Sequence, residues 1–445
     1  MNYTILRTGD RIGTTKLRQV ADASREPHVW IKSGYCVKNG ETVTAIHKDA
    51  SFTWVRCANG EEGFVRTAYL CNSTIASGPA FRCGLLADLQ YADCDNVNGR
   101  HYRDTLKVLD RAVDFFNQYA PLAFVAHVGD LVDIRNTFRD SGRASRLALR
   151  AVMEGGNGLR GLCAMRTDKL VCLIGNHELY NFPRTGVDRQ EQPKPTPLAA
   201  PPFADDNNCT YYSFVPAAGW RIVVVDSFIE CACADGRFTE KAKANDAKRR
   251  YEAAKEAAKP NALPPEARRF YDEAKNAYDM NGALGEKQLE WLQDTLRHSM
   301  SVGERVLILS HALFMHASED QCYNLAWDYD SVLELLASDD GKCVVACLHG
   351  HAHAGSVLTD ARGVHHIVLE TPMFCREADG EGQGECGPFV VLEAHATHLV
   401  LKGYGNRRGH PKSRSPLFGD KPNGLSDPPG ELVLPLVVQG VSSEG

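Results

Sequence analysis

The sequence predicts an α/β fold preceded by a small all-β unit. Residues before about 75 form short strand-like runs separated by Asn-Gly turn signals. From Phe81 onward, longer apolar runs alternate with segments of helical periodicity. Several of these apolar runs end in a carboxylate, amide or imidazole side chain. A chain of 445 residues is longer than one hydrophobic core usually serves, so we expect a main domain with smaller units.

The first segment, residues 1–75, is predicted to be a small β-barrel. Its strand-like runs are WIKSGYCV, ETVTAIH, FTWVRC and EGFVRTAYL, with turn signals at KNG and ANG. The order of a tryptophan before a hairpin turn and a Gly-aromatic-Val step resembles a bacterial-type SH3 domain. This resemblance implies an SH3-like barrel whose ligand is unknown.

The segment from about 80 to 405 is predicted to be an α/β domain. Its apolar runs are FRCGLLAD, AFVAHVGD, LVCLIGN, RIVVVDS, RVLILSH, CVVACLHGH, HHIVLET and FVVLEAH. Two intervening segments, RHYRDTLKVLDRAVDFFNQ and EKQLEWLQDTLRH, carry apolar residues at helical spacing. Strands that alternate with helices predict a sheet that is at least partly parallel and covered on its faces.

Two parts of the chain depart from this alternation. Residues from about 239 to 280 are rich in alanine and charged residues, which predicts a helical insertion. Residues 406–445 turn basic and then rich in Pro, Gly and Ser, which predicts a tail of low order.

Composition excludes some classes of partner. The formal net charge of -6 gives no basic surface of the kind that nucleic acids and anionic membranes require. No uninterrupted apolar run reaches the roughly 18 residues of a membrane helix. We therefore expect a cytoplasmic protein that binds neither nucleic acid nor a membrane.

Several cysteines and two histidines are assigned structural roles. The cysteine count of 15 is odd, and Cys83, Cys172 and Cys347 lie inside apolar runs, as buried thiols do. His127 and His349 also lie at such runs, but they lack the motif support described next, so we place both in the structural class.

Five apolar runs end in residues that are able to bind a hard or borderline metal ion. These are Asp88 with Gln90, Asp130, Asn176 with His177, His311, and His351 with His353. Because the carboxyl ends of parallel strands meet at one edge of a sheet, we expect these side chains to lie together. Two carboxylates, two amides and three or four imidazoles suit two divalent ions better than one.

Each of these residues has an ordinary explanation when it is taken alone. A Gly-Asp pair at a strand end usually forms a turn, and an Asn-His pair usually caps a helix. A lone strand-end histidine such as His311 is usually structural. All five would have to coincide at the ends of successive runs, so the metal hypothesis is favoured.

The motifs resemble those of the calcineurin-like metallophosphoesterases. The family pattern is D-x-H/Q, G-D-x-x-D, G-N-H-E, a later strand-end histidine and G-H-x-H. It is matched here by DLQ from Asp88, GDLVD from Gly129, GNHE from Gly175, His311, and GHAH from Gly350. The resemblance implies a four-layer α/β/β/α sandwich with two metal ions at the strand ends. Carried over by position, Asp88, Gln90, Asp130 and His353 would hold one ion, and Asp130, Asn176, His311 and His351 the other.

Further motifs resemble the manganese-dependent ADP-ribose and CDP-alcohol diphosphatases within that family. They are ADLQYAD, HYRDTL, GNHELYNF, NG…QLEWL, LAWDY, GVHHIVLE and LKGYG, spread over about residues 81 to 405. Two motifs depart from the pattern: HAL stands for His-Leu-Pro at His311, and AGS stands for acidic-Gly-Gly after His353. These departures alter loops beside the site and leave the ligands in place.

The resemblance implies a dinuclear-metal phosphohydrolase that cleaves the pyrophosphate of nucleoside diphosphate conjugates, ADP-ribose or CDP-alcohols, through a metal-bridging hydroxide. His177 would hydrogen-bond or protonate the leaving oxygen, and Asp133 would orient and charge the His177 ring. Glu178 would support the site. The ions would be Mn²⁺ first, because the amide oxygen of Gln90 is harder than the histidine usual there, with Fe, Zn or Mg as alternatives.

Two other functions stay open at this point. A cyclic-nucleotide or glycerophosphodiester phosphodiesterase would use the same metals. A binding scaffold, in which the SH3-like unit carries the function, is the alternative outside enzymes. Loss of metal ligands would mark such a scaffold, and none of the motif ligands is lost.

Overall fold

The computed structural model describes backbone and side chains in most of the chain after residue 77. The described ranges are 78–119, 121–138, 142–182, 184, 197–231, 280–316, 323–375, 387–405, 415–417 and 430–436, and before residue 78 only strand segments are described. The predicted helical insertion lies outside the described residues, apart from Met280. No helix among the described residues is long and apolar enough to span a membrane.

The chain divides into two compact units. One comprises Met1–Phe81, Leu392–Lys402 and Glu431–Gly445, and the other comprises Arg82–Val391 and Gly403–Gly430. All the candidate site residues belong to the second unit.

The N-terminal segment contains a seven-stranded sheet of order β3-β2-β6-β5-β4-β1-β7. Its strands are β1 (Asn2–Ile5), β2 (Thr14–Val20), β3 (Trp30–Lys38), β4 (Thr42–Lys48), β5 (Phe52–Cys57), β6 (Glu62–Arg66) and β7 (Leu70–Asn72). The pairings of β2 with β3 and of β4 with β5 are antiparallel. Strands are therefore present where the sequence predicts an all-β unit, but an SH3-like barrel is not shown, and that assignment stays a prediction.

The first large sheet has six strands in the order β12-β9-β8-β21-β22-β23. They are β8 (Phe81–Leu86), β9 (Phe124–His127), β12 (Leu170–Cys172), β21 (Phe389–Ala394), β22 (His398–Tyr404) and β23 (Gly430–Pro435). Strand β9 runs parallel to both β8 and β12. A short connection joins β21 to β22, which makes that pair an antiparallel hairpin and the sheet mixed.

The second large sheet also has six strands, in the order β13-β14-β17-β18-β20-β19. They are β13 (Tyr212–Ala217), β14 (Trp220–Val224), β17 (Arg305–Ser310), β18 (Val344–His349), β19 (Ser356–Thr359) and β20 (His365–Val368). The four central strands are parallel, and the edge strands β13 and β19 are antiparallel to their neighbours. The rings of Phe124 in β9 and Phe214 in β13 meet edge to face at 5.4 Å, so the two sheets pack against each other.

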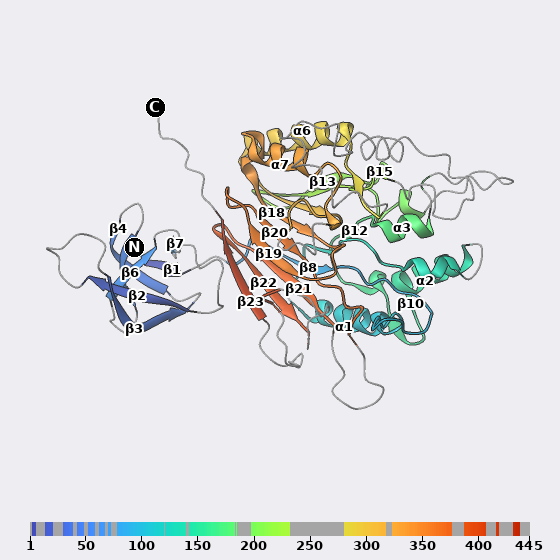
Figure 1. Cartoon of the computed structure of the whole chain (residues 1–445), viewed down its shortest axis with the longest axis horizontal. Coiled ribbons are helices and arrows are strands. Elements are labelled where there is room, and N and C mark those ends of the chain that lie inside the picture. The colour runs from blue at the N-terminus through green and yellow to red at the C-terminus, as the bar shows by residue number, and fades with distance from the viewer. Residues whose placement is uncertain are drawn as a thin grey trace, which may run out of the picture. The chain divides into compact units, whose positions relative to one another are not determined.

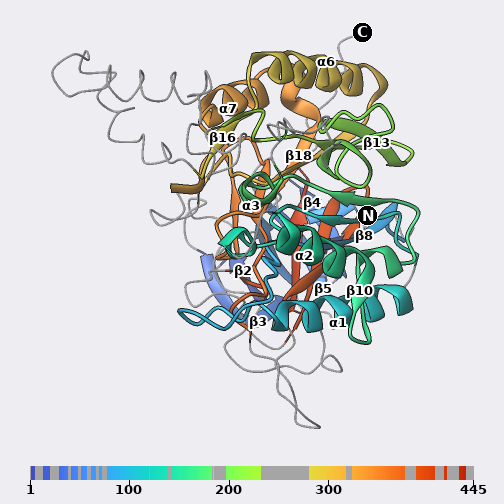
Figure 2. The ribbon, with the colours of Figure 1, turned by 90° about the vertical axis from the view of Figure 1, so that its right-hand side faces the viewer.

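Helices cover these sheets. The longer ones are α1 (Asp104–Gln118), α2 (Arg143–Glu154), α6 (Glu286–Val302) and α7 (Tyr329–Ala337). Figure 1 and Figure 2 both show α6 and α7 beside each other on one side of the strands and α1 on the other. Phe116 of α1 packs edge to face on Phe389 of β21 at 5.3 Å. On α6, Leu292 and Leu296 are fully buried.

Shorter elements connect the main ones. They are η2 (Ile134–Phe138), β10 (Gly155–Gly156), β11 (Leu159–Arg160), η3 (Leu162–Ala164), α3 (Asn176–Asn181), η4 (Pro197–Ala199), β15 (Glu230–Cys231), β16 (Gly282–Ala283) and η7 (Asp340–Cys343). Helix α3 is the important one for the site, because it begins directly after β12 with the Asn-His pair of the G-N-H-E motif.

The predicted α/β alternation is confirmed. All eight apolar runs form strands, both predicted helices form, and the central strands are parallel. Strand β23 was not expected, because its apolar stretch ELVLP lies in a segment whose overall composition predicts low order. A sheet edge that pairs with such a stretch outweighs the composition around it.

Candidate metal centre

The predicted ligands lie in the loops that follow β8, β9, β17 and β18 and, for Asn176, at the start of α3 after β12. The side chains of Asp88, Gln90, Asp130 and His311 are almost wholly shielded from solvent. These strands belong to both large sheets, so the ligands from the two sheets meet where the sheets' carboxyl ends come together. The fold thus gathers residues that lie more than two hundred positions apart in the sequence.

Asp130 stands at the middle of the cluster. Its Oδ2 atom lies 3.3 Å from Nε2 of His311 and 3.0 Å from Nε2 of Gln90. Asp130, His311 and His351 form one group of possible metal ligands, with ligand atoms within 4.8 Å of one another, and Asp88, Asp130 and His353 form a second. Asp130 belongs to both groups, which is the placement that a carboxylate bridging two ions requires.

The ligand loops adopt an unusual backbone. Five candidate ligands have positive φ values: Asp88 (50°), Gln90 (44°), Asp130 (60°), His351 (65°) and His353 (61°). Residues with a side chain avoid this left-handed region, and exceptions gather at functional sites. The left-handed residues are themselves the candidate ligands, so the strained backbone lies where each loop presents its ligand to the cluster.

Several polar atoms in the cluster are buried without a hydrogen-bond partner among the described residues. They are Oε1 of Gln90, Oδ1 of Asn176 and Nε2 of His311. The Nδ1 atom of His311 lies 2.6 Å from the carbonyl oxygen of Val128, so Nδ1–H donates and Nε2 is the nitrogen that faces Asp130. An amide oxygen, an imidazole nitrogen and a carboxylate gathered in a buried site are ligand atoms of divalent cations, so the residues present fit a metal centre.

The electrostatics of the cluster lead to the same conclusion. Burial lowers the pKa of His311, but Asp130 and Asp88 outweigh it and raise this pKa to about 9. Burial raises the pKa of Asp88 well above its usual value. Burial acts in the same direction on Asp130, but His311 and His177 hold its pKa well below the usual range. The buried carboxylates therefore favour a positive charge beside them, which divalent ions would supply.

Gln90 and His351 each show which of their atoms faces the centre. Nε2 of Gln90 lies 2.9 Å from Nε2 of His353, so the amide nitrogen faces the cluster; as a ligand, Gln90 would present Oε1 after a half-turn of the amide. Nε2 of His351 lies 2.8 Å from Oδ1 of Asn281, which leaves Nδ1 as the lone-pair nitrogen. Asn281 was missing from the predicted site, although it begins the short NG motif before β16.

His177 lies at the rim of the cluster. Its side chain is 12% exposed, and its Nε2 is 4.0 Å from Oδ2 of Asp130. Nδ1 accepts a hydrogen bond from the backbone N–H of Ile134 at 2.9 Å and lies 3.4 Å from Oδ2 of Asp133. Asp133 is therefore beside the ring as predicted, but the backbone N–H holds Nδ1, which places the proton of a neutral ring on Nε2.

Glu178 ties the ligand loops together. Its Oε2 accepts hydrogen bonds from the backbone N–H groups of Asp130 and Gly175 at 2.7 and 2.9 Å, and its Oε1 accepts from Leu131 at 2.7 Å. Burial, reinforced by the nearby Asp130, raises the Glu178 pKa to about 7. Gly175 is required here, because a Cβ at that position would overlap the Asp130 carboxylate. These contacts agree with the supporting role predicted for Glu178.

The chain is similar to proteins of known activity, although no protein-family model matches it. It is 32% identical over 315 residues to the manganese-dependent ADP-ribose/CDP-alcohol diphosphatase of Arabidopsis thaliana, covering 67% of this chain and 88% of that protein. It is 30% identical over 348 residues to the protein of the same name from Mus musculus, covering 74% and 92%.

A solved structure shares the fold. A dimetal phosphatase from Danio rerio aligns with a TM-score of 0.55 and 24% sequence identity, over 80% of this chain and 99% of that one. The chain therefore belongs to the calcineurin-like metallophosphoesterases, a family of metal-dependent hydrolases, and is related to the manganese-dependent ADP-ribose/CDP-alcohol diphosphatases.

Proposed function

We propose that this protein hydrolyses the pyrophosphate bond of nucleoside diphosphate conjugates, with ADP-ribose and CDP-alcohols as substrates and a nucleoside monophosphate as one product. The observation that carries the proposal is that Asp130 is shared by two groups of ligands, which supports a two-ion centre. The names of the relatives from Arabidopsis thaliana and Mus musculus support the substrate class.

One ion would be held by Asp88, Gln90, Asp130 and His353, and the other by Asp130, Asn176, His311 and His351. When bound, two divalent ions activate a water molecule and withdraw charge from the phosphate oxygens. Mn²⁺ is the proposed ion, because carboxylate and amide oxygens make up about half of these ligands and favour a harder cation than zinc.

The side chains around the ions have defined tasks. His177 carries its proton on Nε2, so it would donate a hydrogen bond to the leaving oxygen. Asp133, whose Oδ2 lies 3.4 Å from Nδ1, would help to position the ring. Asn281 holds His351 in the tautomer that presents Nδ1, and Glu178 fixes the backbone around Asp130.

An add-back experiment tests the function. The protein is stripped of metal with a chelator, supplied with Mn²⁺, Mg²⁺ or Zn²⁺, and assayed with ADP-ribose, CDP-choline, 2′,3′-cyclic AMP and a phosphopeptide. We expect the highest rate with Mn²⁺, and AMP or CMP as the product from the first two substrates. Exclusive cleavage of the cyclic nucleotide would overturn the proposal in favour of a phosphodiesterase.

A matched variant tests the metal preference separately. Gln90→His restores the histidine of the common family motif, so we expect the ratio of Mn²⁺-supported to Zn²⁺-supported rates to fall. If the wild-type protein is already fastest with Zn²⁺, the argument from Gln90 is wrong, whatever the substrate.

Three further assignments rest on sequence and belong to the same proposal. The N-terminal strands would form an SH3-like barrel, and the protein would act in the cytoplasm. The large domain would be a four-layer α/β/β/α sandwich, which is supported by α1 against the first sheet and α6 beside the second.

A further inference from the structure

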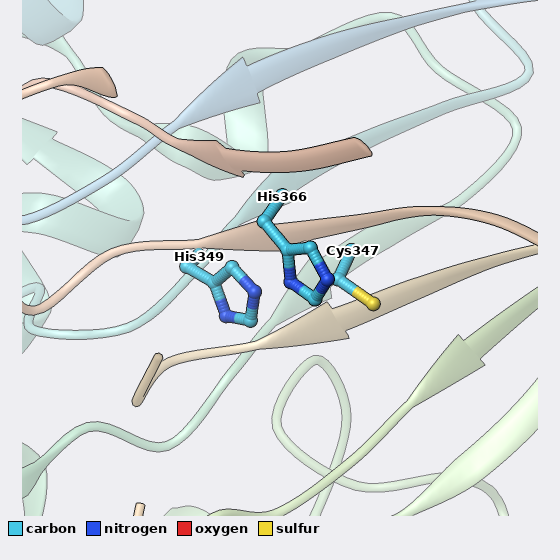
Figure 3. Close-up of side chains that lie close together, drawn as sticks. All are labelled: Cys347, His349 and His366. Carbon is cyan, nitrogen blue, oxygen red and sulfur yellow. The ribbon is translucent and has the colours of Figure 1, made fainter. Parts of the chain in front are cut away.

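A second histidine cluster lies in the body of the second sheet. Cys347 and His349 are alternate residues of β18 and point to the same face, and Cys347 pairs in register with His366 of the parallel neighbour β20. Figure 3 shows the thiol and the two rings gathered on this face. All three side chains are at most 1% exposed, and their ligand atoms lie within 4.8 Å of one another.

The imidazole nitrogens in this cluster are poorly satisfied. Nδ1 of His349 lies 2.9 Å from the carbonyl oxygen of Ala312, so Nδ1–H donates and Nε2 is left with a buried lone pair. Neither that Nε2 nor either ring nitrogen of His366 has a hydrogen-bond partner among the described residues. The nearest acid, Asp360, has its Oδ2 atom 3.9 Å from Nε2 of His366, which is too long for a hydrogen bond.

Such an arrangement is costly unless something binds to it. Each buried polar atom left without a partner costs about 1–3 kcal/mol. The surroundings do not compensate. Phe314 packs edge to face on His349 at 5.0 Å, and Ile308 of β17 pairs with Cys347. Ser310 pairs with His349, but its hydroxyl donates to the carbonyl oxygen of Ala312. The two imidazole planes are stacked at 3°, with centroids 6.0 Å apart, so neither ring can donate to the other.

We propose that Cys347, His349 and His366 form a third metal site, which binds a soft or borderline cation of the Zn²⁺ or Cu⁺ class. Thiolate and imidazole are the ligands that these cations prefer, and no carboxylate is among the three. The Nδ1 hydrogen bond of His349 to a backbone carbonyl is the usual support of a metal-bound histidine.

The protonation state of the thiol determines how binding depends on pH. Burial raises the pKa of Cys347, so the thiol is protonated at pH 7 when no cation is bound. Binding of the cation would form a metal–sulfur bond and release the thiol proton to solvent, so affinity would rise with pH.

The site would be structural. Complete burial leaves no path for a substrate, and the cation would join β18 to β20 just before the chain reaches His351 and His353. The sequence predicts that His349 and Cys347 are ordinary buried side chains of an apolar core. Under this proposal they would instead be metal ligands. Neither the two-ion centre nor the proposed reaction depends on this third ion.

Cobalt substitution tests the proposal on the full chain. Co²⁺ bound to a thiolate absorbs in the near ultraviolet through sulfur-to-metal charge transfer, whereas Co²⁺ bound by Asp, Gln, Asn and His does not. The two-ion centre contains no sulfur ligand, so the band separates the third site from it, and the cysteine variants below separate it from other thiols. We expect saturating Co²⁺ to produce this band with the intensity of one thiolate-bound ion per chain. Either Zn²⁺ or Cu⁺ should remove it by displacement, while Mn²⁺ leaves it unchanged.

Matched variants make the result decisive. Cys347→Ala should lose the band completely, and His366→Leu should lose it or weaken it strongly. The control Cys83→Ala removes another buried strand thiol, outside this cluster, and should keep the band. Absence of the band in the wild-type protein, or its survival in a folded Cys347→Ala protein, would overturn the proposal. Mn²⁺-dependent hydrolysis by Cys347→Ala shows separately whether the proposed function holds.

Discussion

The candidate metal centre and the Cys347–His349–His366 cluster are both buried groups of histidines, yet the chain builds them differently. The centre uses loops with left-handed residues at the ends of strands from both sheets, and it contains carboxylates. The cluster uses regular strand register within one sheet and contains a thiol instead. Loops that end strands can admit a substrate, whereas side chains held between paired strands cannot, so the difference separates a catalytic arrangement from a structural one.

The strongest test of this difference compares one ligand from each cluster. Asp130→Ala removes the carboxylate shared by both ligand groups, so turnover should fall to background and both ions should be lost. Cys347→Ala should keep turnover and both of these ions. Hydrolysis of ADP-ribose with Mn²⁺ and elemental analysis of each protein measure the two effects. If Asp130→Ala retained two ions, the bridging role would be wrong.

His177→Ala separates binding from catalysis within the centre. The ring contacts Asp130 only at 4.0 Å and is not among the proposed ligands, so the variant should keep its metal. Loss of the proton donor should lower the rate by about 10²–10⁴-fold. Elemental analysis and single-turnover rates decide the point, and loss of metal with the ring would instead make His177 a ligand.

Glu178→Gln tests whether the hydrogen bonds that Glu178 accepts stabilise the backbone of the ligand loops. An amide would turn its NH₂ group towards N–H donors that now face a carboxylate, so the free energy of unfolding should fall by about 1–3 kcal/mol. Urea unfolding below and above about pH 7 measures this loss. The loss should be larger at the lower pH, because the raised pKa of about 7 means that burial disfavours the ionised carboxyl in the folded protein.

Glu154→Gln is the matched control for that experiment. Glu154 forms an exposed ion pair with Arg150, so the change should stay within about 1 kcal/mol. Equal losses in the two variants would show that Glu178 has no special part in the site.

His127 is a buried histidine that belongs to neither cluster. Both its ring nitrogens lack partners among the described residues, and burial, with a contribution from His311, lowers its pKa to about 3. Unfolding allows this ring to take up a proton below its ordinary pKa of about 6.5, so stability should fall with falling pH by about 1.4 kcal/mol per unit. His127→Leu should remove that loss.

Urea midpoints of the two proteins at about pH 7.5 and about pH 5.5 measure the effect of His127. The free energy of unfolding of His127→Leu, relative to that of wild type, should rise as the pH falls from about 7.5 to about 5.5. A constant difference would mean that the ring is already charged in the folded state.

The sequence predicted the centre better than it predicted the cluster, for a physical reason. Strand-end ligands such as Asp88 and Asp130 follow recognisable apolar runs, and parallel strands always deliver their ends to one edge. The contact between Cys347 and His366 depends on the register of β18 against β20, which neither strand specifies alone. His349 alone therefore carries no signal of a metal site, because its neighbours across the sheet are set by this register.

Other details of the centre depend on contacts that only the folded structure shows. Asn281 reaches His351 from a loop 70 positions away, and no periodic pattern marks it. The tautomer of His177 is decided by the backbone N–H of Ile134, which has no side-chain signature. Backbone donors and long-range loop contacts carry no residue-type signal, so they are the part of a site that sequence patterns omit.

The left-handed backbone of the ligand loops has an evolutionary consequence. Glycine adopts this conformation without strain, whereas each of Asp88, Gln90, Asp130, His351 and His353 adopts it at a cost of up to about 1–2 kcal/mol. Natural selection for folding alone would replace them with glycine. A descendant of this gene that no longer needed the activity would gain stability as glycine replaced its metal ligands. A screen for well-folded protein would therefore not detect the loss of activity.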